Sequence, residues 1–346
     1  MAAPAQADDS LIADITDRVS LAARQWRPDA AIDRVRPLTG GTSSLTFIAE
    51  IAAVEDGGEA LVIKIAPPGL PPVRNRDVLR QGRVMSALAG ADGVAVPAIR
   101  FSDPGSPPER PPLIAMDMIP GECTEPLLDA ERPRDPATRE QTRHRFLDAV
   151  RMLGNLHRLR PAALGLGLEA PVPLAAEIDR WTRAFETVPA DLQGDYRSAA
   201  DALSATMPEP VAPVINHGDF RLGNTLCVGD RITAIIDWEI WSVGDPRIDL
   251  SWLAYFTDEA GHPAAAGSQP CGTPAITEVV AGYEEAVGTA VRDLEWFHAL
   301  TRYKEAAATG LLIKRARRKG TLSRSFQQME PALPALVAEA RTLVGY

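Results

Sequence analysis

The sequence predicts an α+β protein in two parts, a small β-rich part with one helix and a larger, mainly helical part. Short apolar runs bounded by Gly, Pro and polar clusters fill residues 33–119, a pattern typical of strands. Apolar residues recur at helical spacing after about residue 138. Pro120-Gly121 stands between the two patterns, so we expect one domain over residues 1–119 and a second over residues 120–346.

Composition excludes several classes of function. The net charge of −10 argues against general nucleic-acid binding, which needs a basic surface. Cys123, Cys227 and Cys271 form neither a disulfide framework nor a metal-binding pair, which favours a reducing compartment. No apolar run reaches transmembrane length, and Asp8 and Asp9 stand where a signal peptide would be positively charged. We therefore expect a soluble cytoplasmic protein without nucleic-acid or membrane partners, either a monomer or a homodimer.

The first part opens with a predicted packing helix over residues 11–26, followed by three strands over 33–38, 45–51 and 60–66. A Gly/Ser/Thr loop joins the first two strands. Such loops are often plain turns, but their backbone N–H groups and hydroxyls can also cradle phosphates. The candidate phosphate-binding residues in this loop are Gly40, Gly41, Thr42, Ser43 and Ser44.

Lys64 interrupts the third apolar strand. An edge-strand lysine that points to water is one explanation. A buried lysine needs an anionic partner, and the loop upstream makes a phosphate the better candidate. A helix over residues 77–89 and strands over 96–101 and 111–120 complete this part. Residues 116–119 are expected to form a hinge, where backbone groups of Asp117 and Met118 face a cleft between the two parts, a favoured place for a ligand.

The second part begins with a long core helix over residues 138–159, in which His157 is interpreted as a structural histidine. Residues 161–212 are first rich in proline and then helical. Three more helices are predicted near 275–287, 292–316 and 324–343.

Residues 214–256 are the most informative stretch. Two short apolar strands, 214–215 and 232–236, each end in a polar cluster: His217-Gly218-Asp219 after the first and Asp237-Trp238-Glu239 after the second. A third polar group, at residues 244–249, opens an amphipathic helix. Acids at strand ends are a common way to build a rigid metal and proton-transfer site, although a plain polar loop cluster is the alternative interpretation.

Phosphoryl transfer needs a phosphate cradle, a cation on the phosphates, Mg²⁺ held by oxygen ligands, and a base for the acceptor hydroxyl. The loop at residues 39–44 and Lys64 would supply the first two. Asp219 is the candidate base, and Asn224 and Asp237 are the candidate metal ligands.

These motifs resemble those of the aminoglycoside phosphotransferase-like family, bilobal relatives of the protein kinases. Residues 217–224, HGDFRLGN, match the family's H-G-D-x-x-x-x-N catalytic loop, and residues 236–239, IDWE, match its metal-binding motif. Residues 244–250, GDPRIDL, match the G-D-P-x-x-D-L that follows. The resemblance covers roughly residues 30–320.

The resemblance implies a protein-kinase-like fold, ATP or GTP with Mg²⁺, and O-phosphorylation of a small molecule. It also implies that His217 and Asp249 brace the catalytic loop and that Arg221 contacts the transferred phosphate. One position departs from the family pattern. Gln81 stands where a helix glutamate usually pairs with the strand lysine, and it can accept a hydrogen bond from Lys64 but offers no opposite charge. The alternatives are that Asp77 substitutes for the glutamate or that the match between the helix positions is displaced.

The region 292–319, which is rich in basic residues, bears on the acceptor substrate. Its positive charge favours an anionic or neutral hydroxyl substrate, and it makes the chain more similar to the metabolic, hydroxyacyl-CoA kinase-like branch of the family than to the resistance enzymes. A solvated helix end explains the same charges equally well. Two other functions stay open beside a metabolite kinase: an aminoglycoside phosphotransferase, and a nucleotide-binding pseudokinase with a regulatory role. A metal-dependent hydrolase would lack the histidine ligands that such sites commonly use.

Overall fold

The computed structural model describes residues 9–38, 45–52, 59–265 and 269–346. The chain divides into two compact units, of which unit 1 comprises residues 1–121 and 233–241 and unit 2 comprises residues 122–232 and 242–346. Residues 233–241, which lie in the second part of the sequence-based division, therefore group with unit 1. The α+β fold class is confirmed, with an antiparallel sheet in unit 1 and mainly helices in unit 2.

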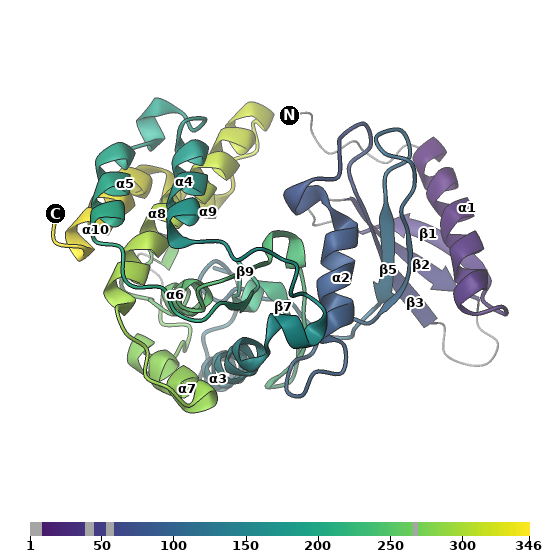
Figure 1. Ribbon diagram of the computed structural model, residues 1–346, viewed down its shortest axis with the longest axis horizontal. Helices are drawn as coiled ribbons and strands as arrows, with labels where there is room; N and C mark the ends of the chain where they lie inside the picture. The colour runs from purple at the N-terminus through teal and green to yellow at the C-terminus, as the bar shows by residue number, and fades with distance from the viewer. Residues whose placement is uncertain (1–8, 39–44, 53–58, 266–268) are drawn as a thin grey trace. The chain divides into compact units, whose positions relative to one another are not determined.

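Unit 1 is built on a five-stranded antiparallel sheet with the strand order β1-β2-β3-β5-β4 (Figure 1). Helices α1 and α2 lie on its two sides. The strands are β1 (Ile32–Pro37), β2 (Leu45–Ile51), β3 (Glu59–Ile65), β4 (Ile99–Asp103) and β5 (Leu113–Asp117), and the helices are α1 (Asp9–Trp26) and α2 (Val78–Leu88).

The alternation of side chains in β3 decides where Lys64 points. Leu61 and Ile63 of β3 pack in one buried cluster with Val19 of α1, so these strand positions face α1. Because neighbouring residues of a strand point to opposite faces, Lys64 points to the other face. Its cross-strand partner Ile114 shares that face, where a Cβ on the α2 residue Gly82 would meet Ile114 Cγ2 at 3.1 Å. Lys64 thus lies on the α2 side of the sheet.

Unit 2 is mainly helical. Its helices are α3 (Pro136–Arg158), α4 (Leu174–Phe185), α5 (Tyr196–Ala205), α6 (Arg247–Tyr255), α7 (Ile276–Val287), α8 (Leu294–Lys319), α9 (Arg324–Met329) and α10 (Leu333–Leu343). Short strands accompany them: β6 (Val214–Asn216), β7 (Thr225–Val228) and β9 (Ser242–Gly244), with β8 (Arg231–Ile235) running into unit 1. Antiparallel pairing joins β6 to β9, with Ser242 opposite Asn216, the residue before the HGD loop, and Gly244 opposite Val214.

Helices α4, α5, α8 and α10 enclose the main core of unit 2. Its buried side chains include Trp181, Phe185, Leu203, Tyr303 and Leu336. None of the helices over the described ranges combines the length and apolar composition that a membrane span requires.

The predicted elements are present, with one difference near the C-terminus. The single helix predicted over 324–343 is two α-helices, with a 3-10 turn at Glu330–Ala332 between them. Pro331 and Pro334 explain the break, because neither residue has the backbone N–H that an uninterrupted α-helix requires there.

Candidate active site

The sequence-predicted site residues fall in both units. The predicted phosphate-binding loop, Gly40 to Ser44, lies outside the described residues. Lys64, Gln81, Asp117, Met118 and Asp237 belong to unit 1, and His217, Asp219, Arg221 and Asn224 belong to unit 2.

In unit 1, Lys64 is paired with the predicted metal ligand Asp237. Lys64 is buried, and its Nζ donates a hydrogen bond of 2.8 Å to Asp237 Oδ1. Asp237 has a φ of +64°, a left-handed conformation that aspartate tolerates better than most residues. This backbone turn at the end of β8 presents the carboxylate to Lys64 while 43% of the Asp237 side chain stays exposed.

Three contacts between Trp241 and Arg80 fasten the segment after Asp237 to α2. Trp241 is buried, its indole Nε1 donates to the Arg80 carbonyl at 3.2 Å, and its own carbonyl accepts from Arg80 Nη1 at 2.9 Å. The Arg80 guanidinium also lies 3.9 Å from the centroid of the Trp241 ring. These contacts account for the grouping of residues 233–241 with unit 1.

Gln81 and Asp77 both have roles other than supporting Lys64. Gln81 is only 1% exposed, and its Nε2 donates to the Asn75 carbonyl at 3.1 Å. Asp77 caps α2, since its Oδ1 accepts from the backbone N–H of Arg80 at 3.0 Å. The expectation that one of them replaces the missing glutamate is therefore corrected: among the described contacts, the carboxylate partner of Lys64 is Asp237.

The predicted hinge residues use their backbone N–H groups within the sheet. The N–H of Asp117 donates to the Ala98 carbonyl at 3.0 Å, and that of Met118 donates to the Ala60 carbonyl at 3.3 Å. The Asp117 carboxylate is paired with Arg100 at 2.5 and 2.7 Å. A nucleotide contact at this position would have to use a carbonyl oxygen or the exposed Met118 side chain.

In unit 2, strand β6 leads directly into the HGD loop, and Asp249 anchors that loop from the first turn of α6. The fully buried Asp249 carboxylate accepts from the backbone N–H groups of His217, at 2.6 Å, and Gly218, at 2.8 Å. Gly218 has a φ of +86°, a conformation that favours glycine. His217 Nδ1 accepts from the N–H of Asp219 at 3.2 Å, which closes the turn.

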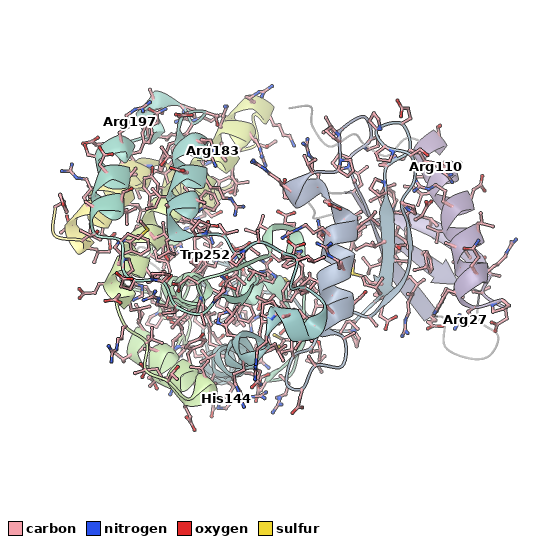
Figure 2. The ribbon with its side chains drawn as sticks, viewed as in Figure 1. Arg27, Arg110, His144, Arg183, Arg197 and Trp252 are labelled. Atoms are coloured by element: carbon pink, nitrogen blue, oxygen red, sulfur yellow. The ribbon has the colours of Figure 1, made fainter. Side chains whose placement is uncertain are left out.

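The Asp219 carboxylate is held by donors from three side chains. Its Oδ1 accepts from the indole Nε1 of Trp252 at 2.7 Å (Trp252 is labelled in Figure 2) and from Arg221 Nε at 3.3 Å, and its Oδ2 accepts from Asn224 Nδ2 at 2.7 Å. Burial alone would raise the pKa of Asp219, but the positive charges of Arg221 and Lys304 outweigh this effect and hold the pKa below its ordinary value. Asp219 is therefore an oriented carboxylate at neutral pH.

Asn224 is oriented by the same residue. Its Nδ2 donates both to the Asp219 carbonyl, at 2.8 Å, and to Asp219 Oδ2. Nδ2 is thus the side-chain atom that binds Asp219, which leaves the side-chain oxygen of Asn224 for another ligand, and Asp237 similarly has Oδ2 beside the Oδ1 that binds Lys64. Carboxylate and amide oxygens are ligands that suit Mg²⁺, so the chemistry of both residues fits the predicted metal. The described residues contain no cluster of three or more His, Cys, Asp and Glu side chains that would form a separate metal site.

Arg221 is joined to a residue that the sequence reasoning missed. Its Nη1 donates to Glu125 Oε2 at 3.2 Å, and the same oxygen accepts from the N–H of Gly223 at 3.0 Å. Burial raises the pKa of Glu125 in spite of the nearby guanidinium, and the pKa of Arg221 is also raised, by Asp219 and Glu125 against the effect of burial. Glu125 follows the sheet part in a loop without a motif, so no sequence signal pointed to it.

Four of the seven lysine and arginine residues of α8 are engaged in internal contacts. Buried Lys304 donates to the Gly218 carbonyl, and Lys314 donates to the Thr187 carbonyl. Arg302 pairs with Glu339 and Asp258, and Arg317 pairs with Asp191 and Glu330. These charges, which favoured an anionic acceptor, thus have partners within the protein.

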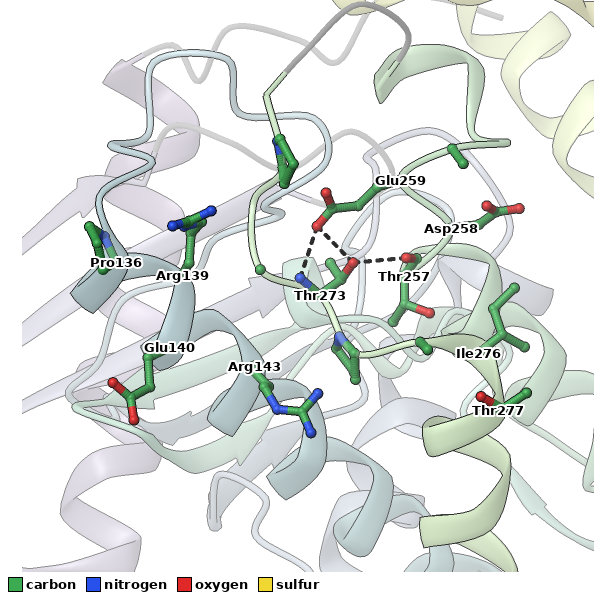
Figure 3. Close-up of a pocket in the computed structure, with 15 residues that line it drawn as sticks. Pro136, Arg139, Glu140, Arg143, Thr257, Asp258, Glu259, Thr273, Ile276 and Thr277 are labelled. Carbon is green, nitrogen blue, oxygen red and sulfur yellow. Dashed lines mark hydrogen bonds between the residues drawn. The ribbon is translucent and has the colours of Figure 1, made fainter.

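A cavity of about 740 Å³ in unit 2 is lined by none of the site residues that the sequence predicts. It lies between the start of α3 and residues 257–277 (Figure 3). The Glu259 carboxylate organises this wall, because it accepts from the backbone N–H of Thr273, at 2.9 Å, and from its hydroxyl, at 2.8 Å. The predicted chemistry thus lies elsewhere in the molecule.

Comparison with known proteins agrees with the motifs. The model of the phosphotransferase enzyme family (APH) matches residues 34–297. Among curated relatives, acyl-CoA dehydrogenase family member 11 of Gallus gallus is 27% identical over 79% of this chain and 35% of its own length. Acyl-CoA dehydrogenase family member 10 of Mus musculus is 25% identical over 62% of this chain and 20% of its own length. The chain thus spans about a third or less of these relatives.

Solved structures share the fold at lower identity. A putative aminoglycoside phosphotransferase from Ralstonia eutropha has a TM-score of 0.73 at 20% identity, over 95% of this chain and 98% of that one. A macrolide 2'-phosphotransferase from Brachybacterium faecium has a TM-score of 0.53 at 22% identity, over 91% and 97%. With a family model that covers most of its length and an HGD loop arranged as described, the chain belongs to the phosphotransferase enzyme family.

Proposed function

We propose that the protein transfers the γ-phosphoryl group of ATP, or of GTP, to a hydroxyl group of a small metabolite, with Mg²⁺ as cofactor. The observation that carries this proposal is the Asp219 carboxylate. It is ionised, 29% of its side chain is exposed, and Trp252, Arg221 and Asn224 fix its orientation. A protein that only bound nucleotide would not need an oriented base of this kind.

In this function Asp219 orients the acceptor hydroxyl and accepts its proton as the oxygen forms a bond to the γ-phosphorus. The bond between that phosphorus and the β–γ bridging oxygen breaks, and a nucleoside diphosphate leaves. The transition state is loose, so the base acts mainly by positioning the hydroxyl and takes the proton late. Arg221, whose charge is permanent, would contact the transferred phosphate.

The nucleotide would be bound by Lys64, the loop at residues 40–44, and the hinge at Asp117 and Met118. Asn224 and Asp237 would hold Mg²⁺, which neutralises phosphate charge when bound. The hydrogen bond between Lys64 and Asp237 within unit 1 supports this assignment, because it joins the proposed phosphate-binding cation to the proposed metal ligand. GDP and ADP complexes are known of structurally similar phosphotransferases, which supports a nucleotide as donor.

The acceptor is proposed to be a hydroxyl-bearing metabolite, as in the metabolic branch that the relatives suggest. Internal pairing of Arg302, Lys304 and Arg317 removes much of the support for an anionic acceptor. Kanamycin and spectinomycin complexes of related folds make aminoglycosides the competing acceptor class.

Two variants test the proposal. The wild-type protein should hydrolyse or transfer phosphate from ATP only with Mg²⁺, and both Asp219→Asn and Asp237→Ala should abolish this turnover. Calorimetry should show that only Asp237→Ala weakens Mg·nucleotide binding. A metabolite-pool screen with labelled ATP, supplemented with aminoglycosides and run against Asp219→Asn as the blank, identifies the acceptor. Normal turnover by Asp219→Asn would refute the assigned base, and nucleotide binding without any turnover by the wild type would favour a pseudokinase.

A further inference from the structure

Lys304 is a buried cation that contacts the catalytic loop from another helix. It lies on α8, is 5% exposed, and its Nζ donates a hydrogen bond of 2.5 Å to the Gly218 carbonyl. Gly218 immediately precedes Asp219, so this bond fixes the peptide unit from which the candidate base extends. Nothing in the proposed chemistry requires a cation at this place.

The same ammonium also reaches Asp219 through Trp252. Its Nζ lies 3.6 Å from the centroid of the Trp252 ring, a close cation–π contact. The indole N–H of that ring donates to Asp219 Oδ1 at 2.7 Å. Lys304 therefore acts on both sides of the base: on the peptide bond before it, and on the side chain that orients its carboxylate.

The charges around Lys304 come from three other elements. Asp219 of the loop, Asp249 of α6 and Glu177 of α4 are the carboxylates that favour its charged form, whereas Arg180 of α4 opposes it. Burial lowers the pKa of Lys304 against the attraction of these carboxylates. Replacing a buried ion by an apolar residue of similar volume is often neutral for stability or even stabilising. Packing alone therefore does not explain a lysine at position 304.

We propose that Lys304 is a positioning residue of the phosphoryl-transfer site, which holds the Gly218–Asp219 peptide and the Trp252 indole so that Asp219 meets the acceptor hydroxyl in one fixed orientation. The expected effect on catalysis rests on the proposed function, whereas the contacts of Lys304 with the loop can be tested without any turnover. Lys304 contacts the HGD loop and α6, so we do not count it among the nucleotide-binding residues.

The test compares Lys304→Met with Lys314→Met, which removes a lysine from the same helix away from the HGD loop. The first readout is the ¹⁵N–¹H signal of the Trp252 indole, identified by its absence in Trp252→Phe. In Lys304→Met this signal should move upfield and exchange faster with water, whereas Lys314→Met should leave it in place. Lys304→Arg keeps a positive charge and hydrogen-bond donors, so the wild-type indole signal should return at least in part. If Lys304→Met does not fold, the indole signal is measured in Lys304→Arg instead.

The second readout is Mg·ATP hydrolysis without acceptor. Loss of a hydrogen bond from a charged donor predicts a kcat about 10- to 100-fold lower in Lys304→Met, with the KM for ATP within about threefold of wild type. An unchanged Trp252 signal in folded Lys304→Met, or an effect on KM alone, would overturn the proposal. Absence of both ATP hydrolysis and phosphate transfer in the wild type would refute the proposed function instead, and the indole signal would still decide whether Lys304 holds the loop.

Discussion

The buried Asp249 carboxylate offers a direct measure of how firmly the HGD loop is anchored. It accepts from the N–H of His217 at 2.6 Å and from the N–H of Gly218 at 2.8 Å. Asp249→Asn keeps one acceptor oxygen and turns the other into a donor, so one buried N–H loses its partner. A bond to a charged acceptor contributes about 1.5–3 kcal/mol, and an orphaned buried donor costs about 1–3 kcal/mol. Because these two effects overlap, we expect a loss of stability of about 2–4 kcal/mol.

The pH dependence of this loss follows from the pKa of Asp249. Burial alone would raise this pKa, but His157, whose Nε2 lies 3.7 Å from Asp249 Oδ2, and the nearby His217 and Lys304 outweigh burial and lower it in the folded protein. A carboxyl group with a lowered folded-state pKa contributes stability that is fully present above its unfolded pKa, about 3.9, and is lost as the pH falls through the folded pKa. The difference between wild type and Asp249→Asn should therefore be full near neutral pH and shrink below about pH 4.

Urea unfolding at pH 7 and pH 3.5 measures both effects. Since the chain has two units, unfolding need not be a single transition, and hydrogen exchange of the amides at residues 217 and 218 gives the local free energy of opening. Asp201→Asn on the exposed face of α5 is the matched control, and it should change stability by less than about 0.5 kcal/mol. A loss below about 1 kcal/mol at pH 7, or an equal loss at both pH values, would refute the anchoring role.

Three further substitutions test other parts of the site. Gly218→Ala should cost about 1–2 kcal/mol of stability in urea and lower kcat, because alanine resists the φ of +86°; an unchanged urea midpoint would contradict this. Lys64→Met should raise the Kd for Mg·ADP about tenfold or more in calorimetry by removing the cation that pairs with Asp237, and an unaltered Kd would show that Lys64 does not bind phosphate. Gln81→Glu should destabilise unit 1 by about 1–3 kcal/mol, because it buries a carboxylate opposite the Asn75 carbonyl; a higher melting temperature would instead show that Lys64 turns to the new carboxylate.

The sequence predicted the elements and the site residues that depend on local pattern. Strand β3 and the HGD loop follow from short apolar runs with polar ends, and the structure holds Asp219 and Asn224 together within one loop. Five residues separate these two positions, so their closeness is set by the loop itself.

Partners distant in sequence could not be predicted in this way. Lys64 pairs with Asp237, 173 residues away, and the local alternatives Gln81 and Asp77 are used for other contacts. Lys304 lies 86 residues from Gly218 in a helix with many basic residues, and the sequence does not distinguish its charge from those of its neighbours. Contacts such as Lys64–Asp237 and Lys304–Gly218 depend on which buried positions the tertiary fold brings together. The periodicity of a single sequence does not say which distant positions meet.

The grouping of residues 233–241 with unit 1 affects how the protein can be made. On a ribosome, the sheet and Lys64 emerge well before Asp237, and a chain grows by roughly 5–20 residues per second. The 173 residues between Lys64 and Asp237 therefore correspond to roughly 10–35 s during which the lysine lacks its carboxylate. Unit 1 can reach its final structure only after much of unit 2 has been synthesised, and a fragment ending at residue 121 would keep Lys64 without Asp237 and α2 without Trp241.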